Sequence, residues 1–95
     1  MTDEAIRRQK ADLLLEYQEA EDYYMIVSDK HMAMGEAIEQ FLAWFRLQAG
    51  YSVQLTEKHK EAMNYENAMA VIAELRQAKE QVDKLGARKT ALGLN

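Results

Sequence analysis

Two histidines are the side chains of this chain best suited to bind a metal ion, because its 95 residues include no cysteine. In helical bundles, a di-iron site uses Glu-x-x-His pairs whose two side chains lie on one face of a helix. Three positions before His31 the chain has Ser28 instead of glutamate. Thr56 holds the same position before His59, and no His-Glu-x-x-His zinc motif is present. We therefore predict no metal site and no bound cofactor.

Carboxylates and serines are the remaining candidates for catalysis. The densest acidic cluster consists of Glu16, Glu19, Glu21 and Asp22. Paired carboxylates serve as acid and base only in a cleft whose burial moves their pKa values apart, and a helix surface offers no such cleft. The serines Ser28 and Ser52 lack the glycine-flanked turn that presents a nucleophile. We therefore predict no catalytic residues and a protein that is not an enzyme.

Aromatic residues form the largest concentration of apolar side-chain area in the chain. They are Phe41, Trp44, Phe45 and Tyr51. Such clusters close the end of a helical bundle or anchor a partner, because aromatic side chains are enriched among binding hot spots. We predict that these four residues bind a partner. Within the cluster, we expect Phe41 and Phe45 to be buried against a second helix or a dimer mate, and Trp44 to be the anchor for another protein.

The spacing of apolar residues predicts the element that carries this cluster. Residues three and four apart follow one another as Ile6, Leu13, Tyr17, Ala20, Tyr24, Val27, His31, Met34, Ile38, Phe41 and Phe45. Only Lys10 interrupts this repeat, which is typical of one long helix with a coiled-coil-like seam, here over about residues 3–49. An alternative stays open, because Ser28 and Asp29 can cap a helix and Gly35 can end one. That alternative is a three-helix bundle with a break near residues 28–36.

A second helix is predicted over about residues 56–85, with Thr56 as its N-cap. Its apolar face consists of Ala62, Tyr65, Met69, Ile72, Leu75, Val82 and Leu85. Glycine suits the left-handed position after a helix, so Gly50 and Gly86 are expected to end the first and second helices. These boundaries predict one helical hairpin domain over residues 1–86 and a flexible tail over residues 87–95.

Composition agrees with an all-α chain, since proline is absent and alanine, leucine, glutamate and lysine are frequent. No segment reaches the roughly 20 consecutive apolar residues that a membrane-spanning helix needs. The net charge is −4 with both signs interspersed, which gives no electrostatic reason to bind nucleic acid or anionic lipid. We expect a soluble, cytoplasmic protein that binds neither nucleic acid nor membrane.

The apolar arc of the first helix is too broad for one neighbouring helix, because Leu42 and Trp44 flank Phe41 and Phe45. A hairpin that dimerises into a four-helix bundle covers such an arc. We therefore expect a non-enzymatic helical interaction or scaffold protein that acts through self-association, as a homodimer, and through contacts with protein partners.

The alternative function belongs to another class. It is a small helical bundle that binds a metal or an apolar ligand between its helices, near Tyr17, Tyr24 and His31.

Overall fold

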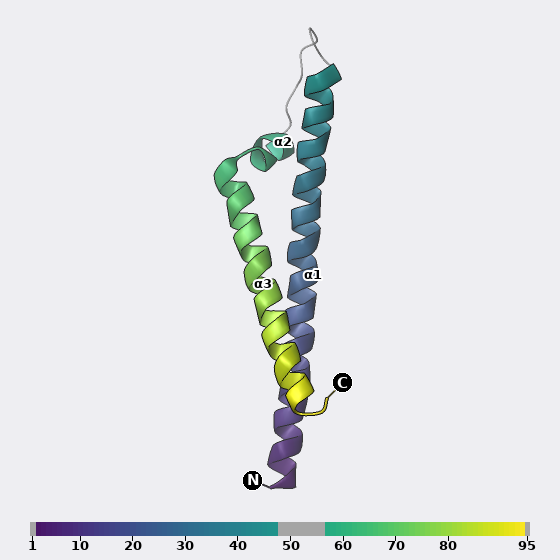
Figure 1. The fold of residues 1–95 in the computed structure, drawn as a ribbon, viewed down its shortest axis with the longest axis vertical. Helices are drawn as coiled ribbons and strands as arrows, with labels where there is room; N and C mark the ends of the chain where they lie inside the picture. Colours follow the sequence, from purple (N-terminus) through teal and green to yellow (C-terminus); the bar gives the residue numbers. More distant parts are fainter. Residues whose placement is uncertain (1, 48–56, 95) are drawn as a thin grey trace.

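The computed structural model describes residues 2–47 and 57–94, without the side chains of Trp44, Leu47 and Lys58. The described residues form α1 (Asp3–Leu47), α2 (Glu57–Ala62) and α3 (Tyr65–Ala91), and no strand. Helix α3 runs back along α1 to form an elongated rod with principal extents of 73 × 19 × 15 Å (Figure 1). The predicted all-α helical hairpin is therefore confirmed.

Helix α1 is continuous through residues 28–36, so the alternative with a break in this region is wrong. Its start is capped by Thr2, whose Oγ1 accepts a hydrogen bond from the backbone N–H of Ala5 at 3.2 Å. Asp3 and Glu4 in the first turn complement the positive end of the helix dipole. Gly35 lies within the helix, where the unbroken apolar seam outweighs the weak helix propensity of one glycine.

The second predicted helix is divided in two. Residues 63 and 64 separate α2 from α3, and Asn64 has an extended backbone with φ −76° and ψ 118°. Its side-chain oxygen accepts a hydrogen bond from the backbone N–H of Asn67 at 3.1 Å. Asparagine side chains compete in this way with the backbone bonds of a helix, which explains why a new helix starts here. The predicted N-cap Thr56 lies outside the described residues.

The predicted helix end at Gly86 is wrong, because α3 continues to Ala91. A Cβ atom added at Gly86 would lie 3.5 Å from Cε2 of Tyr17, so this glycine allows α1 and α3 to approach closely. Residues 87–91, which were predicted to belong to a flexible tail, are therefore helical.

The actual end of α3 uses the other glycine of this segment. Gly93 has φ 72°, the left-handed conformation that suits glycine after a helix. Its N–H donates to the carbonyl of Thr90, and the N–H of Leu94 donates to the carbonyl of Lys89, both at 2.9 Å. These two bonds are the Schellman motif, which satisfies carbonyl groups in the last turn.

The core of the hairpin is thin. Its buried hydrophobic side chains, among the described residues, are Leu13, Val27, Ala37, Ala62, Val71, Ala78 and Leu85. The α3 members recur every seven residues, as expected for a helix packed along a seam. Helix α3 lies close to α1 near its C-terminal end and diverges toward its start, where α2 lies between the two helices (Figure 1). None of the described helices combines the length and hydropathy needed to cross a membrane.

Candidate interaction surface

The predicted aromatic cluster is only partly described. Phe41 is half-buried, and its ring stacks on that of Phe45 with a centroid distance of 6.1 Å and an interplanar angle of 28°. Phe45 is 72% exposed, so the described part of the chain does not bury it. Burial of Phe45 against the second helix is therefore not seen, and its burial against a dimer mate stays a prediction. Tyr51 and the side chain of Trp44 lie outside the described residues.

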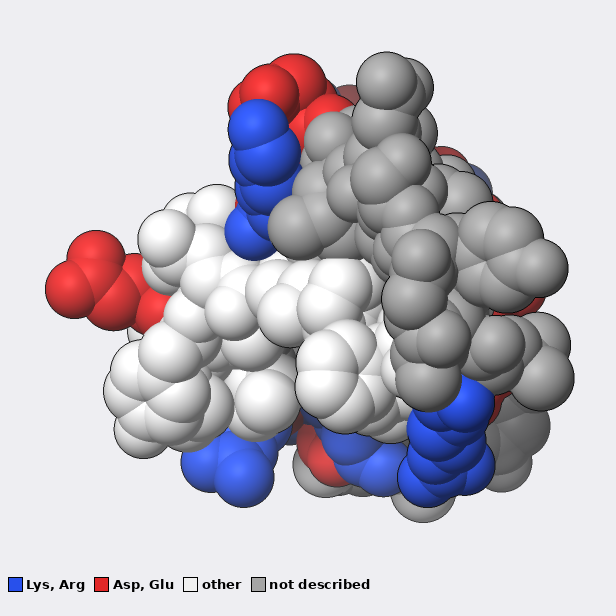
Figure 2. All heavy atoms as spheres, turned by 90° about the horizontal axis from the view of Figure 1, so that it is seen from above, with Lys and Arg blue, Asp and Glu red and all other residues white. Residues whose placement is uncertain are grey.

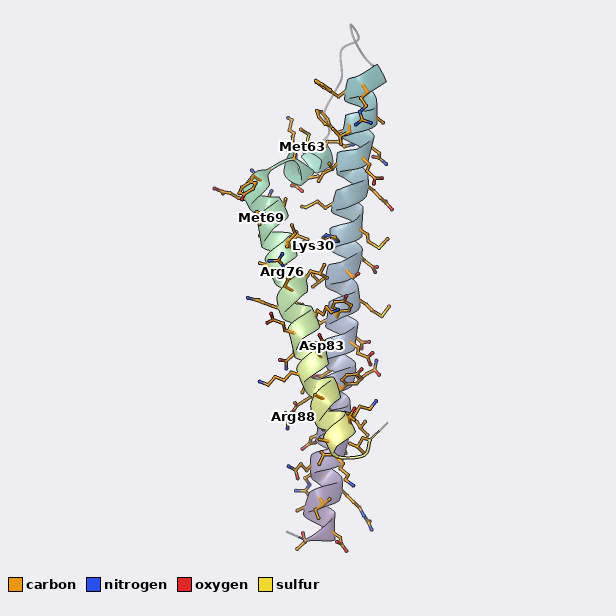
Figure 3. All side chains as sticks on the ribbon, in the orientation of Figure 1. Lys30, Met63, Met69, Arg76, Asp83 and Arg88 are labelled. Carbon is orange, nitrogen blue, oxygen red and sulfur yellow. The ribbon has the colours of Figure 1, made fainter. Side chains whose placement is uncertain are left out.

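One side of the hairpin carries a polar network that joins α1 to α3. The Tyr23 hydroxyl donates to Oε1 of Glu74 at 3.0 Å, and the Lys30 ammonium donates to Oε2 at 3.5 Å. Figure 3 shows Lys30 extending from α1 toward α3. The hydrogen bond to the Glu74 carboxylate raises the pKa of Tyr23 above its ordinary value of 10.0, and desolvation and charge repulsion act in the same direction.

Seven-residue steps place further polar residues in line with this network. On a helix packed along a seam, residues seven apart lie on nearly the same side. The α1 row is Glu16, Tyr23 and Lys30, and the α3 row is Asn67, Glu74, Gln81 and Arg88. We call this side the polar face.

The opposite side of the hairpin is apolar. Tyr24 directly follows Tyr23 of the polar network in sequence, and Leu75 directly follows Glu74. Both therefore lie on the other side of the buried residues between α1 and α3. Seven-residue steps continue these positions as Tyr17, Tyr24 and Ile38 on α1, interrupted by the exposed His31, and as Ala68, Leu75 and Val82 on α3. We call these six residues, with Ile72 of α3 and the edge residues Leu14 and Leu42 of α1, the apolar face.

The apolar face is only partly covered within one chain. Its six central residues are half-buried, and so is Ile72, whereas Leu14 is 43% exposed. A hollow of about 100 Å³ on this face is lined by His31, Met34, Gly35, Ile38, Ala68 and Ile72. At the end of the apolar face near the C-terminus of α3, the ammonium of Lys89 lies 4.7 Å from the ring centroid of Tyr17. Apolar surface thus continues over most of the length of α3.

His31 lies on the predicted seam but its side chain is exposed, at the edge of this hollow. Within the described residues, no group of three or more histidine and carboxylate side chains is placed to hold a metal ion. Two larger hollows, of about 200 and 180 Å³, lie near Lys30, Met34 and Glu61 where α2 meets α1 and α3.

Two further groups of exposed apolar residues lie elsewhere. On the outer side of α1, away from α3, Leu15, Met25 and Met32 alternate with Asp22 and Asp29, which breaks the apolar surface into separate patches.

The second group is at the junction of α2 and α3, where Met63, Tyr65 and Met69 are exposed. Seen from above, the described surface beside the centre of this end is white, without Lys, Arg, Asp or Glu (Figure 2).

The sequence pattern missed the division of the hairpin into two faces. It assigned Ile72, Leu75 and Val82 to one helix face without distinguishing buried from half-buried positions. The signal was present, because Glu74 interrupts that apolar pattern, and Tyr23 and Lys30 are seven residues apart on the other helix.

No protein-family model matches the chain, and neither a curated protein nor a solved structure matches it at a significant level.

Proposed function

We propose that this protein is a non-enzymatic helical interaction or scaffold protein that acts by self-association through the apolar face and by contacts with other proteins. The observation that carries the proposal is the long apolar face on α1 and α3, whose central residues are half-buried beside a thin core. Of the seven buried hydrophobic side chains of the described residues, three are alanine. Burial of apolar surface stabilises by about 25 cal/mol per Å², so covering this face would add substantially to a small core.

A second helical layer fits this face better than a small ligand does. Small-molecule sites usually enclose roughly 300–1,000 Å³. The hollows near Met34 hold only about 100 to 200 Å³ each. An apolar surface that follows two helices instead supports packing against two further helices, as in a four-helix bundle. The cytoplasmic location stays a prediction.

Two adjacent leucines allow a matched test of the proposal. Leu14 is 43% exposed on the apolar face, and Leu15 is 60% exposed on the outer side of α1. We expect sedimentation equilibrium to show that the parent chain and Leu15→Glu are dimers at micromolar concentration. Leu14→Glu should be a monomer, because it places a charge in the proposed dimer interface. Its helical circular dichroism should be unchanged, because position 14 lies outside the core of the hairpin.

A monomeric parent chain would contradict the proposal, and so would equal dissociation of the two variants. In either case, a thermal-shift screen of metals and apolar ligands would test the alternative function, since a bound ligand stabilises the folded state.

A further inference from the structure

We propose that two copies pack through their apolar faces with their helices in the same direction along the rod, so that each α1 lies over α3 of the second copy. This arrangement rests on the proposed self-association. It goes further, because it specifies the orientation of the dimer and the residues that meet.

The register of the hairpin determines which residues share a level along the rod. Tyr17 lies beside Gly86, since a Cβ there would be 3.5 Å from the tyrosine ring, and Lys30 lies 3.5 Å from Glu74. A two-fold axis parallel to the rod leaves every residue at its own level. Each level of α1 therefore faces the same level of α3 in the second copy, and the intrachain register also applies between the copies.

The rows at the edges of the apolar face are complementary in size at this register. The α1 edge row is Leu14, Glu21, Ser28, Gly35 and Leu42, and the α3 edge row is Tyr65, Ile72, Lys79 and Gly86. Ile72 falls between the levels of Ser28 and Gly35, where a Cβ added at Gly35 meets nothing within 4 Å. Leu14 falls about one turn from Gly86. At the levels of Ile72 and Leu14, large side chains thus face small ones, as knobs-into-holes packing requires.

The same register pairs the charges of these rows. Each edge row, as defined, contains one charged residue, and Glu21 and Lys79 come within about one turn of each other's level. Neither forms an ion pair with another described residue of its own chain. In the opposite orientation, α1 would lie over α1 and Glu21 would face an edge row without a cation. Charge complementarity therefore favours the orientation in which α1 lies over α3.

The area of the face suits a stable dimer. The 27 residues of α3 extend over about 40 Å at 1.5 Å per residue, and the hairpin is 19 Å broad in the view of Figure 1. The overlap of two such faces therefore has an upper limit of roughly 750 Å² on each copy, which is comparable with the roughly 800 Å² per partner of standard stable interfaces.

Charge reversal tests the pairing. We expect Glu21→Lys alone and Lys79→Glu alone to weaken the dimer about tenfold each, because either change places like charges together at two symmetric positions. An equimolar mixture of the two variants should recover the parent dissociation constant, since both pairs are then opposite in charge. Asp22→Lys, which makes the same charge change on the outer side of α1, should leave the dissociation constant unchanged.

Disulfide trapping gives a second readout, because the chain has no cysteine of its own. Separately purified Leu14→Cys and Gly86→Cys variants, distinguished by mass and then mixed and oxidised, should form a covalent heterodimer. If the parent chain is a dimer but the mixture of charge variants still associates weakly, this orientation is wrong. It is also wrong if Leu14→Cys forms a disulfide with Leu42→Cys instead. Both results leave the proposed self-association intact. A monomeric parent overturns both.

Discussion

Replacing Gly35 by alanine should stabilise the monomeric hairpin by about 1 kcal/mol. Gly35 lies in the interior of α1, and a Cβ atom added there meets no atom within 4 Å. The substitution therefore causes no steric conflict and gains the difference in helix propensity between glycine and alanine, about 0.8–1.0 kcal/mol. For a domain of this size, such a gain raises the melting temperature by roughly 4–8 °C.

Thermal melts followed by circular dichroism measure this effect, at a concentration low enough to keep the chain monomeric. Ala33→Gly, an exposed site two residues earlier in α1, is the matched reverse change and should lower stability by a similar amount. At higher concentration, Gly35→Ala should weaken the dimer, because its new methyl group enters the space proposed for Ile72 of the second copy. A lower melting temperature for dilute Gly35→Ala would refute the reasoning, since it would mean that Gly35 ends a helix.

Two further predictions concern the core and the polar face. Leu85→Ala should lower the free energy of unfolding by about 2–5 kcal/mol in urea denaturation, because Leu85 is 2% exposed. As a control, Leu15→Ala should change the free energy of unfolding by less than about 0.5 kcal/mol. Equal effects of the two substitutions would contradict the described core. Tyr23 has a pKa in the folded state above the unfolded value of 10.0. Its hydrogen bond to Glu74 therefore contributes its full stabilisation of the folded state below pH 10, and this contribution is lost as the pH rises through the folded pKa. The stability difference between the parent and Tyr23→Phe should therefore shrink above pH 10, and a difference independent of pH would contradict this assignment.

The long helix was predictable because its signal repeats over many turns. A three-four spacing from Ile6 to Phe45 leaves few alternatives, and a single glycine at position 35 cannot outweigh it. The two ends of α3 were harder to predict, since each depends on one residue. At the start of α3, Asn64 accepts a hydrogen bond from the N–H of Asn67, a contact that the sequence pattern does not reveal.

The choice between two glycines also depended on tertiary structure. Gly86 and Gly93 are equivalent as helix-ending residues in the sequence, but Gly86 lies against Tyr17 and stays helical. The interaction surface was only partly predictable for a related reason. Apolar spacing identifies the side of α3 that faces α1, but it does not show which of those residues one neighbouring helix leaves half-covered.

The short helix α2 makes local opening easier at one end of the rod than at the other. Ala62 is the buried hydrophobic residue among the described side chains of α2, whereas Leu13 and Leu85 are buried near the opposite end. Detaching α2 uncovers the small side chain of Ala62 and the part of α1 around Ala37, so its free-energy cost is below that of global unfolding. Around Leu85, opening removes a whole leucine from the core. We therefore expect the hairpin to open first at the α2 end, beside the hollows near Met34, and to open last around Leu85.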